Sequence, residues 1–254
     1  MKFTARARAA LLAGLLTLGL APAARAVDLT VSAAASLAES FRELAPAFEA
    51  QHPGTHVVLN FAASDALLAQ IRQGAPVDVF ASADEATLDK AQAAGLLAAG
   101  TRHVFSHNAL VLIVPGDARH VPKGLADLRD PAYARVALGA PAGVPAGRYA
   151  QGALQGAGLW DAVAPKAVFA TNVRQALDYV VRGEVDAGFV YATDAQAFAD
   201  KVRVVFDVAT PTPIAYPLAV VEGSRAAELA RAFADFVRSP AGQAVLARHG
   251  FRAP

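Results

Sequence analysis

Three serines of the sequence stand where an anion could bind. Ser36, Ser64 and Ser82 each follow a predicted strand of small or apolar residues and precede a predicted helix. The first N–H groups of a helix have no internal partner and carry partial positive charge, so a serine hydroxyl beside them adds to a set of hydrogen-bond donors. Taken alone, each serine is better explained by helix capping, and Ser36 with Glu39 has the S-x-x-E spacing of a capping box. Three such turns at one edge of a sheet favour an anion site.

The sequence lacks the residue patterns on which common hydrolases and nucleotide-binding enzymes depend. It contains no G-x-S-x-G, H-E-x-x-H or G-x-x-x-x-G-K-[ST] motif, and no histidine or lysine flanks Ser36 or Ser64 to act as a base. Because the chain has no cysteine, thiolate zinc sites, iron–sulfur clusters and cysteine nucleophiles are excluded. The prediction is a protein that is not an enzyme, with a periplasmic serine hydrolase as the less favoured alternative.

Two pairs of histidines have the four-residue spacing of a helical zinc site. Pro53 interrupts the helix that would hold His52 and His56, and His103 and His107 precede a predicted strand. We therefore expect exposed loop histidines, and neither a metal site nor a cofactor.

The first 26 residues have the three parts of a secretory signal peptide. Basic residues open the chain, an apolar run covers 9–20, and Ala24-Arg25-Ala26 supplies an A-x-A cleavage sequence. This run is shorter than the roughly 18–20 residues that span a bilayer. Cleavage after Ala26 and a periplasmic location are therefore predicted.

Composition and charge exclude two further classes. Of the 254 residues, 55% are hydrophobic and 18% are charged, which suits a folded core and is unlike a disordered chain. Loss of residues 1–26 removes four positive charges and no acid, so the formal charge falls from +1 to −3. A mildly acidic protein is a poor partner for nucleic acid, and none is expected. An anion site in this chain must therefore depend on local geometry.

Strand and helix patterns alternate after residue 27 and predict an α/β architecture. Leu37, Phe41, Leu44 and Phe48 recur at helical spacing and mark the first helix as amphipathic. Two half-size lobes joined by short crossover strands fit the pattern better than one large sheet, and each lobe is expected to be a mixed, mainly parallel sheet flanked by helices. The predicted strands cover 28–34, 56–61, 77–81, 108–115, 135–139, 187–191, 202–208 and 215–221, and the predicted helices include 66–73, 83–94, 147–156 and 173–182.

Eight short motifs occur in order along the chain. They are AAASL at 33–37, FAAS at 61–64, QGAPVDVFASAD at 73–84, NALVLIVP at 108–115, VPAGRYA at 144–150, NVRQAL at 172–177, GFVYATDA at 188–195 and YPLAVVEG at 216–223. In these motifs the chain resembles the periplasmic molybdate-binding components of ABC-type transporters. The resemblance implies the two-lobed periplasmic-binding-protein fold (type II), with lobe 1 at 27–107 plus 217–254, lobe 2 at 108–216 and the ligand in the cleft between them.

The resemblance also implies a set of ligand-binding residues. Members of this family hold an oxyanion with serine hydroxyls, main-chain N–H groups and a tyrosine hydroxyl, without a cationic side chain. The matching positions here are Ser36, Ser64, Ala146, Val173 and Tyr191. Ala146 and Val173 would act through their backbone N–H groups. Pro145 near the first turn of one predicted helix and Asn172 as the predicted N-cap of another agree with this role.

Donors without an acceptor favour a fully deprotonated tetrahedral dianion. A proton on hydrogen phosphate would face an N–H or O–H group with nothing to accept it. Molybdate, tungstate and sulfate all satisfy this rule and differ in size, which the sequence does not resolve. The resemblance implies molybdate, with tungstate, as the ligand, and sulfate or phosphate is the alternative. Molybdenum is expected only as bound molybdate, which is cargo. The expected partner is the membrane permease of an ABC importer, and the protein is expected to be a monomer.

One residue departs from the family pattern. Asp65 directly follows Ser64, where relatives carry a small or neutral polar residue. At the start of a helix an acid is stabilised by the helix dipole and would face the surface. Turned inward, the same carboxylate would repel a dianion or accept a proton from hydrogen phosphate. The loop GAPAG at 139–143 also lacks a polar residue common in relatives, so both positions bear on which oxyanion is bound.

Overall fold

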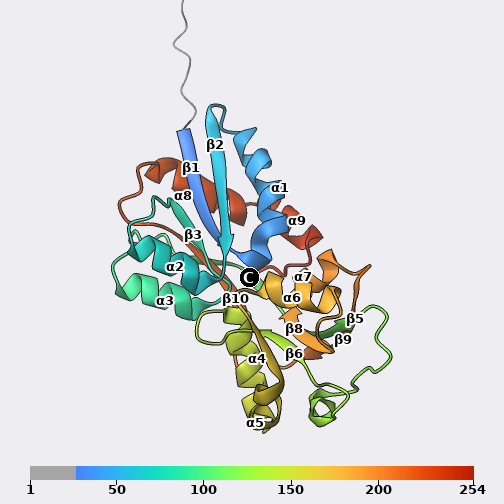
Figure 1. Cartoon of the computed structure of the whole chain (residues 1–254). Helices are drawn as coiled ribbons and strands as arrows, with labels where there is room; N and C mark the ends of the chain where they lie inside the picture. Colours follow the sequence, from blue (N-terminus) through green and yellow to red (C-terminus); the bar gives the residue numbers. More distant parts are fainter. Residues whose placement is uncertain (1–26) are drawn as a thin grey trace, which may run out of the picture.

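The computed structural model describes residues 27–254, which form two five-stranded sheets flanked by helices. Figure 1 shows the first sheet with its helices in the upper half of the molecule and the second in the lower half. The signal-peptide prediction concerns residues 1–26 and lies outside the described residues. Within 27–254, no helix combines the length and apolar character needed to cross a bilayer. The predicted α/β architecture of two mixed sheets is confirmed.

The first sheet combines the N-terminal part of the chain with one strand from the C-terminal part. Its order is β2-β1-β3-β10-β4, and β10 runs opposite to the other four strands. The strands are β1 (Val27–Ala34), β2 (Thr55–Ala62), β3 (Val79–Ala81), β4 (His103–Asn108) and β10 (Ile214–Val220). The helices beside it are α1 (Ala38–Glu49), α2 (Ser64–Arg72), α3 (Glu85–Ala93), α8 (Ala227–Arg238) and α9 (Pro240–Arg248).

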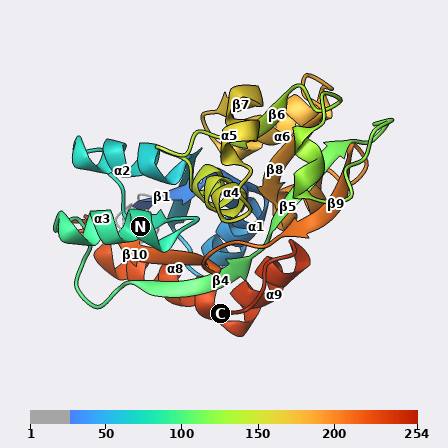
Figure 2. The same ribbon diagram turned by 90° about the horizontal axis from the view of Figure 1, so that it is seen from below.

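The second sheet is built from the middle of the chain alone. Its order is β7-β6-β8-β5-β9, and here β5 runs opposite to the other four strands. The strands are β5 (Leu110–Pro115), β6 (Val136–Gly139), β7 (Ala167–Ala170), β8 (Ala187–Tyr191) and β9 (Val202–Val208). The helices are α4 (Pro145–Gly156), α5 (Trp160–Val163), α6 (Val173–Val181) and α7 (Ala192–Ala197). Seen from below, α4 lies between the two groups of strands (Figure 2).

The chain crosses between the sheets twice. The single strand predicted at 108–115 is divided, because β4 ends at Asn108 in the first sheet and β5 begins in the second, with Ala109 between them. The return crossing is the segment 209–213 between β9 and β10. Hydrophobicity alone does not mark a change of sheet, which is why the sequence predicts one strand where the structure has parts of two.

Apolar residues of α1 fix this helix against the first sheet. Leu37, Phe41, Leu44 and Phe48 are fully buried, as the helical spacing predicts. The ring of Phe48 meets that of Phe233 from α8 edge-on, with centroids 5.2 Å apart. Burial of a large apolar side chain stabilises a fold by roughly 1.5–3 kcal/mol. The turn that precedes α1 is therefore held on a rigid support.

Two glycines allow α4 to begin directly against the end of β6. A Cβ atom at Gly147 would lie 1.9 Å from the carbonyl oxygen of Gly139, which is far inside van der Waals contact. The close approach sets the position of the first turn of α4. It therefore also sets the position of the Ala146 N–H group, which lies in that turn.

Gly147→Ala is expected to lower the free energy of unfolding by about 2 kcal/mol, because the added methyl group must push α4 away from β6. Gly156→Ala, at the end of the same helix, is the matched control, since its Cβ would meet no atom within 4 Å. That change is expected to stabilise the protein by up to about 1 kcal/mol. Urea unfolding followed by circular dichroism measures both effects. Equal effects of the two substitutions would contradict the packing argument.

Candidate functional site

A small cavity lies between the two sheets. Ser36, Ser64, Ala146, Val173 and Tyr191 all line it, so the structure brings together every residue that the sequence predicts for the site. The rest of the lining consists of alanine, valine and proline. We call this space the donor cavity, because its polar lining consists of hydroxyl and amide groups.

Neither Ser36 nor Ser64 uses its hydroxyl to cap a helix. Ser36 lies in a 3₁₀ turn directly before α1, and no side chain caps α1, so the predicted capping box with Glu39 is wrong. Ser64 is the first residue of α2, which also lacks a side-chain cap. The Ser64 Oγ accepts a 3.1 Å hydrogen bond from the Ala83 N–H group. The hydrogen of Ser64 therefore remains available to a ligand. Ser36 Oγ lies 2.9 Å from Tyr216 Oη, and either oxygen of this pair can be the donor.

Ser82 does not join the other two serines. It is fully buried, and its Oγ accepts a 3.2 Å hydrogen bond from the N–H group of Asp84. Asp84 is in turn the N-cap of α3 and accepts the Thr87 N–H group at 3.2 Å. Ser82 thus helps to begin α3, and its neighbour Ala83 lines the donor cavity instead. Of the three serine turns, two converge.

Two helices beside the second sheet begin at the donor cavity. α4 begins at Pro145, which places Ala146 in the first turn as predicted. α6 begins at Val173, and the Asn172 side chain caps it by accepting the Gln175 N–H group at 3.0 Å, also as predicted. First-turn N–H groups have no carbonyl partner within their own helix and carry partial positive charge. Both helices therefore offer backbone donors to the cavity.

Tyr191 borders the donor cavity from the end of β8. The residue is buried, and its hydroxyl donates a long hydrogen bond of 3.4 Å to the Ala83 carbonyl across the junction of the sheets. Burial raises the pKa of Tyr191 well above its ordinary value, so the hydroxyl stays protonated at neutral pH. A bond of this length costs little to exchange for a shorter bond to an anion.

Asp65 lies outside the donor cavity and pairs with two cations. Its carboxylate lies 2.7 Å from Lys90 Nζ and 2.7 Å from the Arg148 guanidinium. Burial raises the pKa of Asp65, but the hydrogen bonds from Lys90 and Arg148 outweigh this effect and hold the pKa below its ordinary value. The carboxylate thus neither faces open solvent, as the dipole argument predicts, nor turns toward a ligand. Arg148 also lies 2.6 Å from Asp84, so α4 is tied to the first sheet by an ion-pair cluster that we call the Arg148 bridge.

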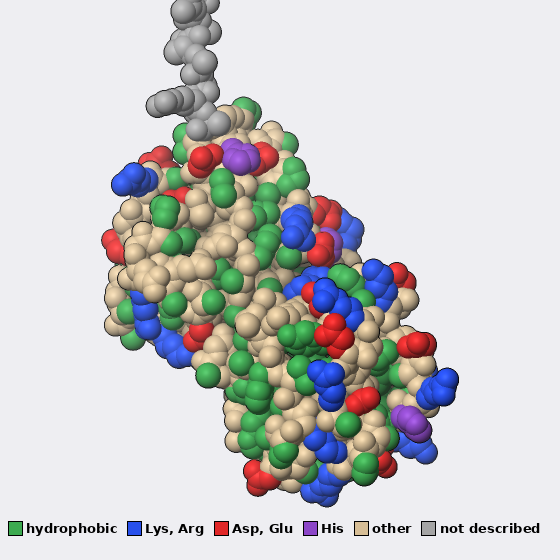
Figure 3. Space-filling model, in the orientation of Figure 1, with side chains coloured by type: hydrophobic (Ala, Val, Ile, Leu, Met, Phe, Trp, Pro, Cys, Tyr) green, Lys and Arg blue, Asp and Glu red, His purple; other side chains and the backbone are tan. Residues whose placement is uncertain are grey.

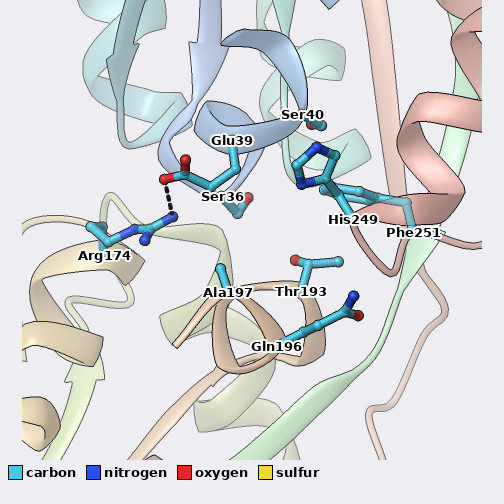
Figure 4. A pocket seen from close by; sticks show the side chains of 9 residues that line it. All are labelled: Ser36, Glu39, Ser40, Arg174, Thr193, Gln196, Ala197, His249 and Phe251. Carbon is cyan, nitrogen blue, oxygen red and sulfur yellow. Dashed lines mark ion pairs between the residues drawn. The ribbon is translucent and has the colours of Figure 1, made fainter. Parts of the chain in front are cut away.

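A second ion pair crosses between the sheets beside Ser36. Arg174 of α6 lies 3.4 Å from Glu39 of α1, and Figure 4 shows this pair at the side of a pocket that Ser36 also lines. Figure 3 shows acidic and basic side chains close together on this face of the molecule near the junction of the lobes. The two second-sheet helices that begin at the donor cavity, α4 and α6, therefore each carry an arginine that pairs with an acid of the first sheet's helices or turns.

Asp194 is an acid without a hydrogen bond behind this junction. It is buried, and neither carboxylate oxygen has a hydrogen-bond partner within residues 27–254. Its nearest cation is Arg174, at 3.6 Å. Burial raises the pKa of Asp194 to about 6, and Arg174 offsets this effect only in part.

The described part of the chain holds no group of three or more acidic or histidine side chains placed to bind a metal ion. His52 stacks on the Phe48 ring, with centroids 4.0 Å apart, while His56 contacts Asp28. His56 lies on strand β2, and His103 and His107 lie on strand β4, so the prediction of exposed loop histidines is wrong for these three residues. Hydrophobicity alone did not reveal β4, because four of its six residues are polar.

The sequence predictions missed the polar residues behind the donor cavity. Tyr216 Oη lies 2.9 Å from Ser36 Oγ, although the two residues are 180 positions apart. Tyr216 and Asn108 each begin one of the eight motifs, and Arg148 lies within a third. The motifs thus marked the correct segments without indicating which side chains meet.

Two lobes that meet over a buried set of hydrogen-bond donors define the class of two-lobed solute-binding proteins. The fold is that of the type II periplasmic binding proteins. The chain belongs to the family of bacterial extracellular solute-binding proteins, which it matches over residues 29–252.

Relatives and solved structures agree with this assignment. The molybdate-binding protein ModA of Escherichia coli (strain K12) is 37% identical over 230 residues, which are 88% of each chain. The putative ABC transporter substrate-binding lipoprotein YvgL of Bacillus subtilis (strain 168) is 36% identical over 89% of this chain and 87% of its own length. The solved periplasmic molybdate-binding protein of Azotobacter vinelandii has a TM-score of 0.76 and 26% identity, over 89% of this chain and 99% of its own. The family resemblance is confirmed.

The buried Asp194 carboxylate predicts a pH-dependent stability. Its pKa is about 6 in the folded protein and close to 4 in an unfolded chain. Between these two pH values the carboxyl group is therefore protonated mainly in the folded state. The stability that the proton contributes is present at low pH and is lost as the pH rises through 6. The free energy of unfolding of Asp194→Asn minus that of the wild type is expected to be about 1 kcal/mol larger at pH 7.5 than at pH 5. Urea unfolding at the two pH values measures this difference. The exposed Asp161, changed to Asn, is the control, and a pH-independent effect of Asp194→Asn would contradict the raised pKa.

Proposed function

We propose that the protein captures molybdate, and also tungstate, in the periplasm and delivers it to the membrane permease of an ABC importer. The observation that carries the proposal is the convergence of five donor positions on one cavity, which among residues 27–254 is lined by uncharged side chains. The proposed ligand-binding residues are Ser36, Ser64, Ala146, Val173 and Tyr191. The names of the E. coli and A. vinelandii relatives as molybdate-binding proteins support this ligand.

Uncharged donors select an oxyanion by its protonation state. Each hydroxyl or amide hydrogen that meets an anionic oxygen contributes roughly 1.5–3 kcal/mol, because the acceptor is charged. A protonated oxyanion brings one hydrogen for which the five proposed donor positions supply no acceptor, and an unpaired buried donor costs about 1–3 kcal/mol. Molybdate and tungstate carry no proton at neutral pH and therefore satisfy every donor.

The proposed binding cycle is a closure of two lobes about the crossings at Ala109 and 209–213. Ser36 and Ser64 approach the ligand from one lobe, while the α4 and α6 amides and the β8 hydroxyl approach it from the other. Opening removes one of the two sets, which lowers the affinity and releases the ion. The lobe limits of 27–107 with 217–254 and 108–216 stay a prediction, and β10 joins the first sheet slightly earlier, at Ile214.

The proposal extends to the whole protein. It includes cleavage after Ala26, a monomeric binding protein, no resident cofactor and no catalytic activity, since molybdate is the cargo. Ser36 Oγ is hydrogen-bonded to the Tyr216 hydroxyl, and Ser64 Oγ is hydrogen-bonded to the backbone N–H group of Ala83. Neither partner is a base that would activate a serine nucleophile, which supports binding over hydrolysis.

Isothermal titration calorimetry tests the ligand assignment directly. Molybdate and tungstate are expected to bind at least about tenfold more tightly than sulfate, and phosphate more weakly still. Ser64→Ala is expected to raise the Kd for molybdate by roughly 10- to 100-fold, because it removes one hydrogen bond to a charged acceptor. Ser239→Ala is the control, since it removes the N-cap of α9 and should lower stability by about 1 kcal/mol without changing the Kd.

Tighter binding of sulfate or phosphate than of molybdate would overturn the ligand assignment. An unchanged Kd in Ser64→Ala would overturn the assignment of the site. Stoichiometric labelling of Ser36 by a serine-directed acylating reagent would overturn the assignment as a protein without catalytic activity.

The Arg148 bridge predicts a slower release of ligand than the donor cavity alone would give. Its ion pairs with Asp65 and Asp84 form only when the lobes are together, so Arg148→Gln is expected to raise the dissociation rate of molybdate about tenfold. Arg102→Gln is the matched control, because Arg102 has nearly the same side-chain exposure (23% against 24%) but pairs with acids of α3 in its own lobe. Stopped-flow displacement measures both rates, and equal rates in the two variants would contradict the role of the bridge.

A further inference from the structure

A chain of side-chain hydrogen bonds lies behind Ser36. Tyr216 Oη is 2.9 Å from Ser36 Oγ and 3.3 Å from Asn108 Nδ2. Asn108 Nδ2 is also 2.9 Å from the Oγ1 atom of Thr193. All four side chains are buried, so each polar atom depends on a partner within the protein.

The backbone fixes the direction of these bonds at one end. The N–H group of Ala109 can only donate, and it donates to Asn108 Oδ1 at 2.9 Å. The Asn108 nitrogen must therefore face Tyr216 and Thr193, and it gives one hydrogen to each.

The Tyr216 hydroxyl lies between Asn108 and Ser36, so the direction of its hydrogen bonds determines which way the Ser36 hydroxyl donates. Burial raises the pKa of Tyr216 well above its ordinary value, so its oxygen keeps the hydrogen while it accepts one from Asn108. Among residues 27–254, Ser36 Oγ is the other polar atom within hydrogen-bonding distance of this hydroxyl. The Tyr216 hydrogen therefore goes to Ser36 Oγ, and the hydrogen of Ser36 itself is left for the donor cavity.

We propose that Tyr216 and Asn108 are positioning residues, which hold the Ser36 hydroxyl as a donor toward the bound oxyanion; this inference rests on the proposed molybdate-binding function. Ser64 Oγ likewise accepts one hydrogen bond and keeps its own hydrogen for the cavity. Its donor is the backbone N–H group of Ala83, which no side-chain substitution can turn into an acceptor. For Ser36 the polarity depends on an amide at the crossing between the sheets. Thr193 of α7 shares that amide, and Figure 4 shows Thr193 and Ser36 bordering the same gap between the lobes.

Asn108→Asp reverses the proposed direction with almost no change of shape. One carboxylate oxygen still accepts from Ala109, but the other can only accept, so Tyr216 donates to it and Ser36 donates to Tyr216. Ser36 then presents a lone pair to the anion. The expected result is a Kd for molybdate raised at least about 100-fold at pH 8, part of which comes from the added negative charge.

Tyr216→Phe separates polarity from charge. In the wild type it removes a support of Ser36 and is expected to weaken molybdate binding about tenfold. In the Asn108→Asp background it removes the acceptor that holds the Ser36 hydrogen, so the double variant is expected to bind molybdate about tenfold more tightly than Asn108→Asp alone. The same substitution thus changes sign between the two backgrounds. Tyr133→Phe, at a buried tyrosine outside the cavity lining, is the control and should leave the Kd unchanged.

Calorimetry with sodium molybdate on the purified protein and its variants gives the result, with thermal unfolding to verify that each variant is folded. A wild type that does not bind molybdate overturns the proposed function, and the inference with it. A wild type that binds, with independent effects of the two substitutions, overturns the inference alone. If Asn108→Asp does not fold, the comparison of Tyr216→Phe with Tyr133→Phe decides, and equal affinities in these two variants overturn the inference.

Discussion

The proposed convergence of hydroxyl and amide donors from both lobes on one cavity is the constraint on which the rest of this structure depends. Each hydroxyl and amide there has lost its contact with water, and an unpaired donor costs about 1–3 kcal/mol. A tetrahedral oxyanion presents an oxygen to each of these donors and so removes that cost for all of them. Ser36 and Ser64 come from one sheet and the α4 and α6 amides from the other, so in the proposed site the same ion would complete the hydrogen bonding of both. Under this proposal, ligand binding and the contact of the two lobes are one event.

Full charges surround the donor cavity without entering it. Arg148 and Arg174 lie one or two residues after the proposed backbone donors of α4 and α6, and each turns to an acid across the junction. Since the guanidinium groups are paired, their fields are largely offset, and the nearby carboxylate of Asp65 does not repel an anion as a free carboxylate would. Ion pairs join the lobes at the edge, while the side chains that line the cavity between them are uncharged, as the proposed selection of oxyanions by protonation state requires.

The sequence was sufficient for the parts of the molecule that depend on local pattern. The stripe of α1, the N-cap Asn172 and the start of α4 at Pro145 follow from residue spacing, and the order of short motifs led to the five cavity residues. Contacts between distant segments were not accessible in this way. Nothing near Ser36 shows that its hydroxyl meets Tyr216, and no pattern around Asp65 shows that an arginine from the other lobe neutralises it. The capping prediction also failed at Ser36, because its hydroxyl is hydrogen-bonded to Tyr216 and does not accept a backbone N–H group of α1.

The position of β10 in the first sheet has a consequence for how the chain acquires its structure. The second sheet uses one continuous stretch of the chain, from Leu110 to Val208. The first sheet lacks the strand between β3 and β4 until the residues from Ile214 to Val220 have been made. Domains usually fold as units while the chain is synthesised, starting from the N-terminus. The first sheet therefore has an open gap between β3 and β4 until β10 is available, whereas the second sheet has all of its strands by Val208, so the lobe that begins first in the chain is the last to have all its strands.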